Sequence, residues 1–119
     1  MRKYLFLLIF LCTFLFLAPS CTPVKKPLDR RTEFSKYLSN TEDDIRKEDW
    51  KNAFNNLENS KKAWRKIKPF LQLDIDHDYV NDIENNFTLL KGYIETKDKS
   101  NSLATILLIK ENWENIGQM

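Results

Sequence analysis

The feature that most constrains the fold of this chain is the spacing of its apolar residues from about Asp29 to the carboxyl end. These residues recur at intervals of three and four positions, which places them on one face of an α-helix. The chain of 119 residues holds only two Gly and four Pro, too few for the turns of a β-fold or for a glycine-rich phosphate loop. The sequence therefore predicts one small all-α domain.

The first two predicted helices run from about residue 29 to 47 and from about residue 49 to 68. We expect a kink or break at Pro69, because proline lacks a backbone donor and disfavours a helical residue before it. The side chains expected in the core from these helices are Phe34, Leu38, Thr41, Ile45, Trp50, Ala53, Phe54, Leu57, Trp64 and Ile67.

The third predicted helix starts at an N-cap, Asp74 or Asp76, and runs to about Lys97. Asp98 or Ser100 is the expected N-cap of the fourth helix, since short oxygen-bearing side chains satisfy the free amides of a first turn. The apolar stripes of these helices comprise His77, Val80, Ile83, Phe87, Leu90 and Ile94, then Leu103, Ile106, Leu107, Ile109, Trp113 and Ile116.

The short junctions between consecutive helices predict antiparallel neighbours, and hence an antiparallel helical bundle of two helix hairpins over residues 29–119. A shift of 49 residues also aligns the two halves in seven apolar pairs. It maps Phe34, Leu38, Ile45, Phe54, Leu57, Trp64 and Ile67 onto Ile83, Phe87, Ile94, Leu103, Ile106, Trp113 and Ile116. An internal duplication would explain this match. The alternative is chance, because two helical hairpins of similar length can be aligned in only a few registers.

The amino terminus differs in kind from the rest of the chain. Arg2 and Lys3 precede a stretch without any charge, residues 4–18, which is shorter than the roughly 20 apolar residues of a spanning helix. The pattern is typical of an export signal over residues 1–20. The remainder of the chain is then expected on the extracytoplasmic face of the cell membrane.

The string Leu17-Ala18-Pro19-Ser20-Cys21 resembles a bacterial lipobox, in which a small residue precedes a Cys that becomes lipid-modified. Ser20 fits that pattern and Pro19 departs from it. Cleavage would leave Cys21 as the only Cys, without a disulfide partner. The alternative is an uncleaved N-terminal membrane anchor. In both cases residues 21–28 are expected to form an extended tether.

Without Arg2 and Lys3, the acidic and basic residues balance at 17 each, so we do not expect nucleic acid as a partner. A local basic run, from Lys61 to Lys68, nevertheless offers Lys62, Arg65 and Lys66 as a binding face for an anionic lipid or envelope polymer. The favoured interpretation of this run is a solvated outer face, since Trp64 lies in the apolar stripe.

The segment Asp74-Ile75-Asp76-His77-Asp78 resembles the start of a calcium loop, but Tyr79 stands where the loop needs Gly and Asn85 where it needs a bidentate carboxylate. Asp76 and His77 remain a candidate polar site at a helix start. With one His in the chain and no nucleophile motif, we expect no enzyme activity, no metal and no cofactor.

Further motifs carry a resemblance to a family. They lie between Trp64 and Ile116 and include Ile75-Asp76-His77, Asn81-Asp82-Ile83-Glu84, Tyr93-Ile94, Lys97-Asp98-Lys99-Ser100 and Leu103, with Glu48-Asp49-Trp50-Lys51-Asn52-Ala53 upstream. They resemble the domain of unknown function 4363 family, short proteins of low-GC Gram-positive bacteria. The resemblance implies membrane attachment and a helical domain, but no activity. Tyr79 and Asn81 replace acidic residues of the family pattern.

Together these observations predict a membrane-tethered extracytoplasmic domain that acts without catalysis, as a protein-interaction or scaffolding lipoprotein with an envelope protein as partner. The alternative is a lipoprotein that binds an anionic surface or ligand through the basic face of Lys62, Arg65 and Lys66.

Overall fold

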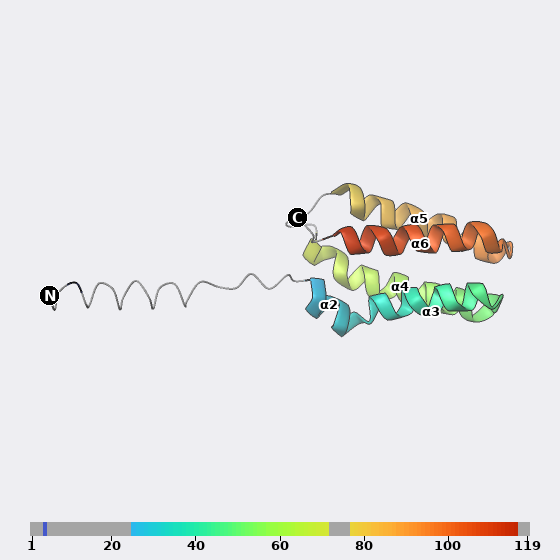
Figure 1. The fold of residues 1–119 in the computed structure, drawn as a ribbon, viewed down its shortest axis with the longest axis horizontal. Coiled ribbons are helices and arrows are strands. Elements are labelled where there is room, and N and C mark those ends of the chain that lie inside the picture. The colour runs from blue at the N-terminus through green and yellow to red at the C-terminus, as the bar shows by residue number, and fades with distance from the viewer. Residues whose placement is uncertain (1–3, 5–24, 72–76, 117–119) are drawn as a thin grey trace.

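The computed structural model describes Tyr4 and residues 25–71 and 77–116, and its regular elements in these ranges are all helices. They are α2 (Lys25–Thr32), α3 (Phe34–Arg46), α4 (Trp50–Leu71), α5 (His77–Glu95) and α6 (Lys99–Asn115) (Figure 1). The prediction of an all-α domain is confirmed. The four helices expected from the sequence correspond to α3 to α6, and α2 is an additional short element.

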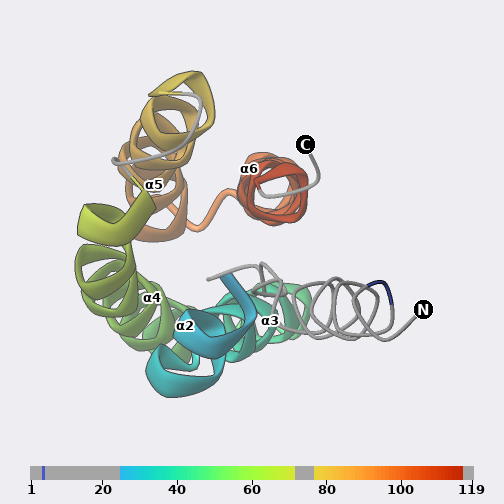
Figure 2. The ribbon, with the colours of Figure 1, turned by 90° about the vertical axis from the view of Figure 1, so that its left-hand side faces the viewer.

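The four long helices form an antiparallel bundle. Helix α3 packs against α4 and α5 packs against α6, while α3 also contacts α6 and α4 contacts α5. Figure 2, seen along the bundle, shows these four helices around a shared interior, with α2 beside α4. The predicted pair of helix hairpins with a common core is therefore confirmed.

The core includes a cluster of four aromatic rings, one from each long helix. The ring of Phe34 lies 5.6 Å from Trp64, 6.3 Å from Phe87 and 5.0 Å from Trp113, measured between ring centroids. Such tilted and edge-to-face pairs stabilise a core by about 0.5–1.5 kcal/mol each beyond the burial of their area. The cluster thereby joins both hairpins at one level of the bundle.

The two hairpin turns have the same backbone conformation. Glu48 has a φ of 58° and Lys97, 49 residues later, a φ of 56°. The amide of Glu48 donates to the carbonyl of Ile45 (3.0 Å), and the amide of Lys97 donates to that of Ile94 (3.1 Å). The 49-residue relation thus extends from apolar spacing to the geometry of the turns.

The helices that follow these turns have matching N-caps. The carboxylate of Asp49 accepts the backbone N–H of Asn52 (3.2 Å) and its side-chain amide (2.7 Å). Asp98 binds Asn101 in the same way, at 3.1 and 2.7 Å. Asp98 is therefore the cap of α6, as one of the two predicted alternatives. The predicted caps of the third helix lie in residues 72–76, outside the described residues.

A single helix over residues 29–47 was expected, and this prediction is wrong. The chain bends at Glu33, which has a left-handed backbone with φ 57° and separates α2 from α3. The bend is stabilised by Asp29, whose carboxylate accepts the N–H of Ser35 (2.8 Å) and its hydroxyl (2.6 Å). Because Leu28 is buried against the bundle, the predicted extended tether is also wrong from Lys25 onward.

Pro69 does not break its helix. It lies inside α4, which continues to Leu71. Pro69 and Arg65, one turn before it, are both exposed, so the carbonyl that loses its helical donor can bind water instead. Leu71 is buried in the core, which favours the continuation of the helix past the proline.

Candidate interaction surfaces

The predicted basic face is present on α4. Lys62, Arg65 and Lys66 are all exposed, on the side of α4 opposite its buried stripe. Among the described residues, no carboxylate lies within ion-pair distance of these three side chains. Their charges are therefore available to an external anion.

The ends of the basic run behave differently from its middle. Lys61 pairs with Glu58 at 3.4 Å, and Lys68 pairs with Glu84 of α5 at 2.6 Å. Trp64 is buried, with 2% of its surface exposed, and its Nε1 donates to Glu84 at 3.2 Å. The tryptophan is thus a core residue, and the free cations of this face are Lys62, Arg65 and Lys66.

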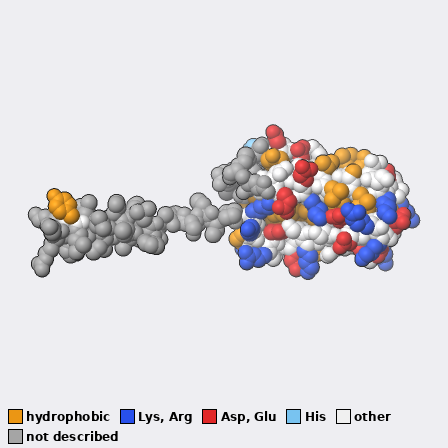
Figure 3. Space-filling model, in the orientation of Figure 1, with side chains coloured by type: hydrophobic (Ala, Val, Ile, Leu, Met, Phe, Trp, Pro, Cys, Tyr) orange, Lys and Arg blue, Asp and Glu red, His pale blue; other side chains and the backbone are white. Residues whose placement is uncertain are grey.

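The second hairpin exposes large apolar side chains. Leu89 of α5 is 50% exposed, and Leu107 and Leu108 of α6 are 45% and 48% exposed. Figure 3 shows apolar side chains at the surface over α5 and α6. The expectation that Leu107 packs in the core is therefore wrong. Its neighbours Ile106 and Ile109 occupy the buried face instead.

The corresponding positions of the first hairpin are polar. Positions 40, 58 and 59, which precede the three leucines by 49 residues, hold Asn40, Glu58 and Asn59. The exposed leucines, Leu89, Leu107 and Leu108, are therefore not a requirement of the bundle architecture. Exposed leucines on two neighbouring helices are candidates for a contact with another molecule.

The candidate polar site at Asp76 and His77 gains no support from the fold. His77 is the first residue of α5 and is exposed, so its predicted place in the apolar stripe is wrong. Asp76 lies outside the described residues. Residues 25–71 and 77–116, with Tyr4, contain no group of three or more His, Cys, Asp and Glu that could hold a metal ion.

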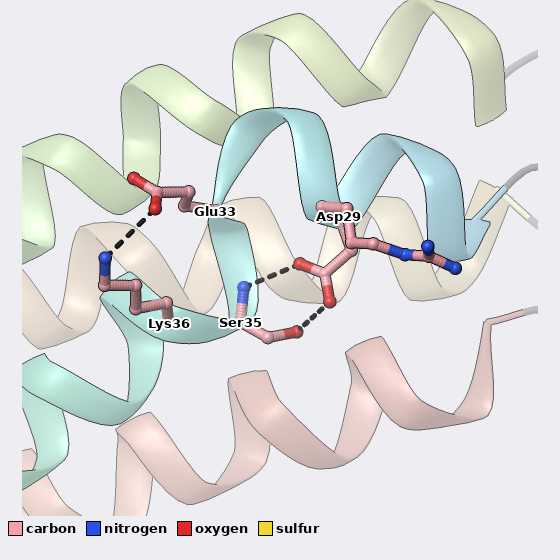
Figure 4. A pocket seen from close by; sticks show the side chains of 5 residues that line it. Asp29, Glu33, Ser35 and Lys36 are labelled. Carbon is pink, nitrogen blue, oxygen red and sulfur yellow. Dashed lines mark hydrogen bonds and ion pairs between the residues drawn. The ribbon is translucent and has the colours of Figure 1, made fainter.

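A shallow hollow lies at the bend between α2 and α3, lined by Asp29, Arg30, Glu33, Ser35 and Lys36. Figure 4 shows that its polar groups bind one another, Asp29 with Ser35 and Glu33 with Lys36. The hydrogen bond from Lys36 to Glu33 raises the pKa of that ammonium group. Four of its five lining residues therefore stabilise the bend, and Arg30 is the lining residue without an ion-pair partner among the described residues.

Helix α6 has polar contacts with α2, through Lys25, and with α3, through Glu42. The Nζ of Lys25 lies 4.8 Å from the centroid of the Trp113 ring, and burial lowers the pKa of Lys25. The carboxylate of Glu42 accepts from Lys110 at 2.6 Å and from Arg46 at 2.8 Å. These two cations hold the pKa of Glu42 below its ordinary value. Both groups stabilise the fold and are not free for chemistry.

Cys21 and the rest of the lipobox-like segment lie outside the described residues. Within the part of the chain that the structure describes, no helix has both the length and the apolar character needed to cross a bilayer.

A comparison with models of known protein families shows to which family the chain belongs. The model of the Domain of unknown function (DUF4363) matches residues 28–119. The chain belongs to this family. The DUF4363 match starts at Leu28 in α2 and includes both hairpins, so the predicted family is confirmed. Comparisons with curated proteins and with solved structures give no match.

Proposed function

We propose that this DUF4363 protein is a non-catalytic interaction domain, tethered to the extracytoplasmic face of the cell membrane, that binds a partner protein through Leu89, Leu107 and Leu108. The tether is supported by the basic start, the uncharged segment and Cys21 in the sequence. The observation that carries the proposal is the exposure of three leucines at positions where the first hairpin has polar residues.

A helical surface of this kind fits a partner that is itself apolar and helical. Exposed leucines on two neighbouring antiparallel helices can receive an amphipathic helix laid along them. The surrounding residues of α5 and α6 include polar side chains such as Asn86 and Glu111, which would form the rim of such a contact.

The test uses the polar residues of the first hairpin as a guide. The double variant Leu107→Glu and Leu108→Asn copies Glu58 and Asn59, and so is expected to fold. In-cell cross-linking followed by mass spectrometry should find a partner with the unchanged chain and lose it on the order of tenfold or more with this variant. Undiminished capture by the variant, at equal helicity and melting temperature, would refute the proposal.

A second candidate function is contact with an anionic polymer or ligand through Lys62, Arg65 and Lys66. It is favoured by the exposure of these cations and by the lack of acidic partners for them among the described residues. Reversal of all three to Glu should abolish binding to cell-wall polymer while partner capture through the leucines continues. Loss of partner capture instead would make the basic face part of the first contact.

Catalysis would show itself differently. An enzyme activity that depends on the single His should disappear with His77→Ala while the helicity of the chain is unchanged. We expect no such substrate-dependent signal.

A further inference from the structure

One face of α2 is fixed to the bundle. Leu28 is buried, with 8% of its surface exposed. Asp29, the only acidic residue of this helix, has both carboxylate oxygens bound by Ser35, at 2.8 and 2.6 Å. Lys25 reaches across to the Trp113 ring and to the carbonyl of Glu114, at 3.3 Å. The position of α2 relative to the other helices is therefore determined by contacts from three of its residues.

The other face of α2 is basic and unpartnered. Lys26, Arg30 and Arg31 are exposed, and no carboxylate of the described residues forms an ion pair with them. Figure 3 shows basic side chains at the end of the bundle that carries α2, and others along its length. In this respect the three exposed cations of α2 resemble Lys62, Arg65 and Lys66 of α4, which also form no ion pair with a described carboxylate.

The sequence places this helix next to the tether. No charged residue occurs between Lys3 and Lys25. If Cys21 carries the lipid, it is four residues from Lys25, and the two Cα atoms are at most about 14 Å apart even in an extended chain. If the leader stays uncleaved, the uncharged segment leads directly into α2. Either way α2 begins close to the headgroups, within reach of their screened field of about 8–10 Å.

We propose that the exposed face of α2, formed by Lys26, Arg30 and Arg31, lies on anionic lipid headgroups and orients the bundle on the membrane. This inference rests on the tether of the proposed function and adds an orientation to it. Phe70, at the end of the neighbouring α4, is 56% exposed and supplies a ring for the headgroup region.

The orientation has a consequence for the rest of the surface. The turns at Glu48 and Lys97 lie at the end of the bundle opposite α2 (Figure 1), so they point away from the membrane. Exposed acidic residues of the second hairpin, such as Asp82 and Glu111, are repelled by an anionic surface. Leu107 and Leu108 on α6 thereby remain accessible to a partner protein.

The strength of the contact follows from the number of cations. Each Lys or Arg next to an anionic membrane strengthens binding by roughly fivefold, so three together give on the order of a hundredfold. Because the tether holds α2 near the surface permanently, this modest affinity suffices for a contact that is occupied most of the time.

The test uses the full chain on two kinds of vesicle, phosphatidylcholine alone and phosphatidylcholine with one-third phosphatidylglycerol. Flotation with the neutral vesicles reports the tether alone. Hydrogen–deuterium exchange of the α2 amides reports the contact. We expect slower exchange in α2 on the anionic vesicles, on the order of tenfold, and a return to the neutral rate at high salt.

The decisive variant is the triple substitution Lys26→Glu, Arg30→Glu and Arg31→Glu, which should abolish the slowing. Its matched control reverses three exposed cations near the opposite end: Lys47→Glu, Lys51→Glu and Lys97→Glu.

Each outcome has a distinct meaning. If the α2 amides exchange at the same rate on both kinds of vesicle, the headgroup contact is refuted. It is also refuted if the control variant loses the slowed exchange as fully as the α2 variant does. In both cases flotation with neutral vesicles still supports the tether. Failure to float with neutral vesicles counts against the tether, and selective α2 protection on anionic vesicles would then still support the headgroup contact.

Discussion

The indole rings of Trp64 and Trp113 meet edge to face in the core, with 6.3 Å between their centroids and an interplanar angle of 86°. Trp64 donates its N–H to Glu84 of α5, and Trp113 donates to Ser35 of α3, at 3.2 and 2.9 Å. Each tryptophan therefore binds the first helix of the other hairpin. The two donors are 49 residues apart, and so are the two acceptors.

These bonds indicate an approximate two-fold axis along the bundle. The same operation relates the turns at Glu48 and Lys97 and the caps Asp49 and Asp98. The places where the halves differ are then informative, since the bundle itself does not require them. The exposed leucines of α5 and α6 and the separate helix α2 are such places.

The two tryptophan hydrogen bonds should contribute unequally to stability. Trp113→Phe removes a donor from the half-buried hydroxyl of Ser35, while Trp64→Phe removes one from Glu84, which keeps its ion pair with Lys68. Both variants lose the same volume. We expect Trp113→Phe to lower the free energy of unfolding by about 1 kcal/mol more than Trp64→Phe. Urea titrations would measure the free energy of unfolding of both variants. Equal decreases would show that the two hydrogen bonds contribute equally.

Replacement of Lys97, the left-handed residue of the second hairpin turn, by glycine should stabilise the fold. Lys97 has a φ of 56°, a conformation that is strained for residues with a Cβ atom. Lys97→Gly is expected to raise the free energy of unfolding by about 0.5–1 kcal/mol. The control is Lys47→Gly, because Lys47 has a φ of −84°, and it should destabilise. Thermal melts compare the stability of the two variants. A lower stability of Lys97→Gly than of the unchanged chain would show that the backbone at Lys97 is not strained.

Ser102 buries a hydroxyl group that forms no hydrogen bond within the described residues. Its side chain is fully buried. The equivalent residue of the first hairpin is Ala53, which is also fully buried. Ser102→Ala should therefore fit without strain and raise the free energy of unfolding by up to about 1 kcal/mol. The same substitution at Thr105, whose hydroxyl donates to Asn101 at 2.7 Å, should destabilise. A loss of stability in Ser102→Ala would show that its hydroxyl is satisfied.

Glu42 should make the stability of the bundle depend on pH in the acid range. Lys110 and Arg46 hold the pKa of its carboxyl below the ordinary value in the folded chain. A depressed folded pKa gives stability that is fully present above the unfolded value, about 4.3, and is lost as the pH falls through the folded pKa.

Glu42→Gln should therefore cost about 1 kcal/mol at neutral pH, since the side chain is only 14% exposed, and have little effect below the folded pKa. Urea titrations over this pH range test the difference. A cost that does not change with pH would mean that the loss comes from packing and not from charge.

Most of the fold follows from apolar spacing alone. The stripe of α5 from Val80 to Ile94 is buried as predicted, because an interval of three and four residues leaves one choice of face. Asp98 was predictable as a cap from its position before an apolar stripe. The bend at Glu33 was not, since a left-handed residue other than Gly or Asn carries no sequence signal. The spacing of Asp29 and Ser35 around it was the available hint.

The candidate surfaces were predictable in part. Lys62, Arg65 and Lys66 lie opposite the stripe of α4, so helical phase alone gives their exposure. The exposure of Leu107 and Leu108 was not predicted, because all four residues from Ile106 to Ile109 are apolar. Periodicity alone does not decide which of these four face the core. The 49-residue relation held the missing signal. It aligns Leu107 and Leu108 with polar residues of the first hairpin.

The most direct test of the account is the location and mass of the mature chain. Cell fractionation with protease treatment of intact spheroplasts, followed by mass spectrometry of the recovered chain, reports both. We predict a membrane-bound chain that external protease degrades, starting at a lipid-modified Cys21 or retaining its uncharged leader in the bilayer. A protease-protected, unmodified chain in the soluble cytosol would contradict the tether and the functions proposed from it.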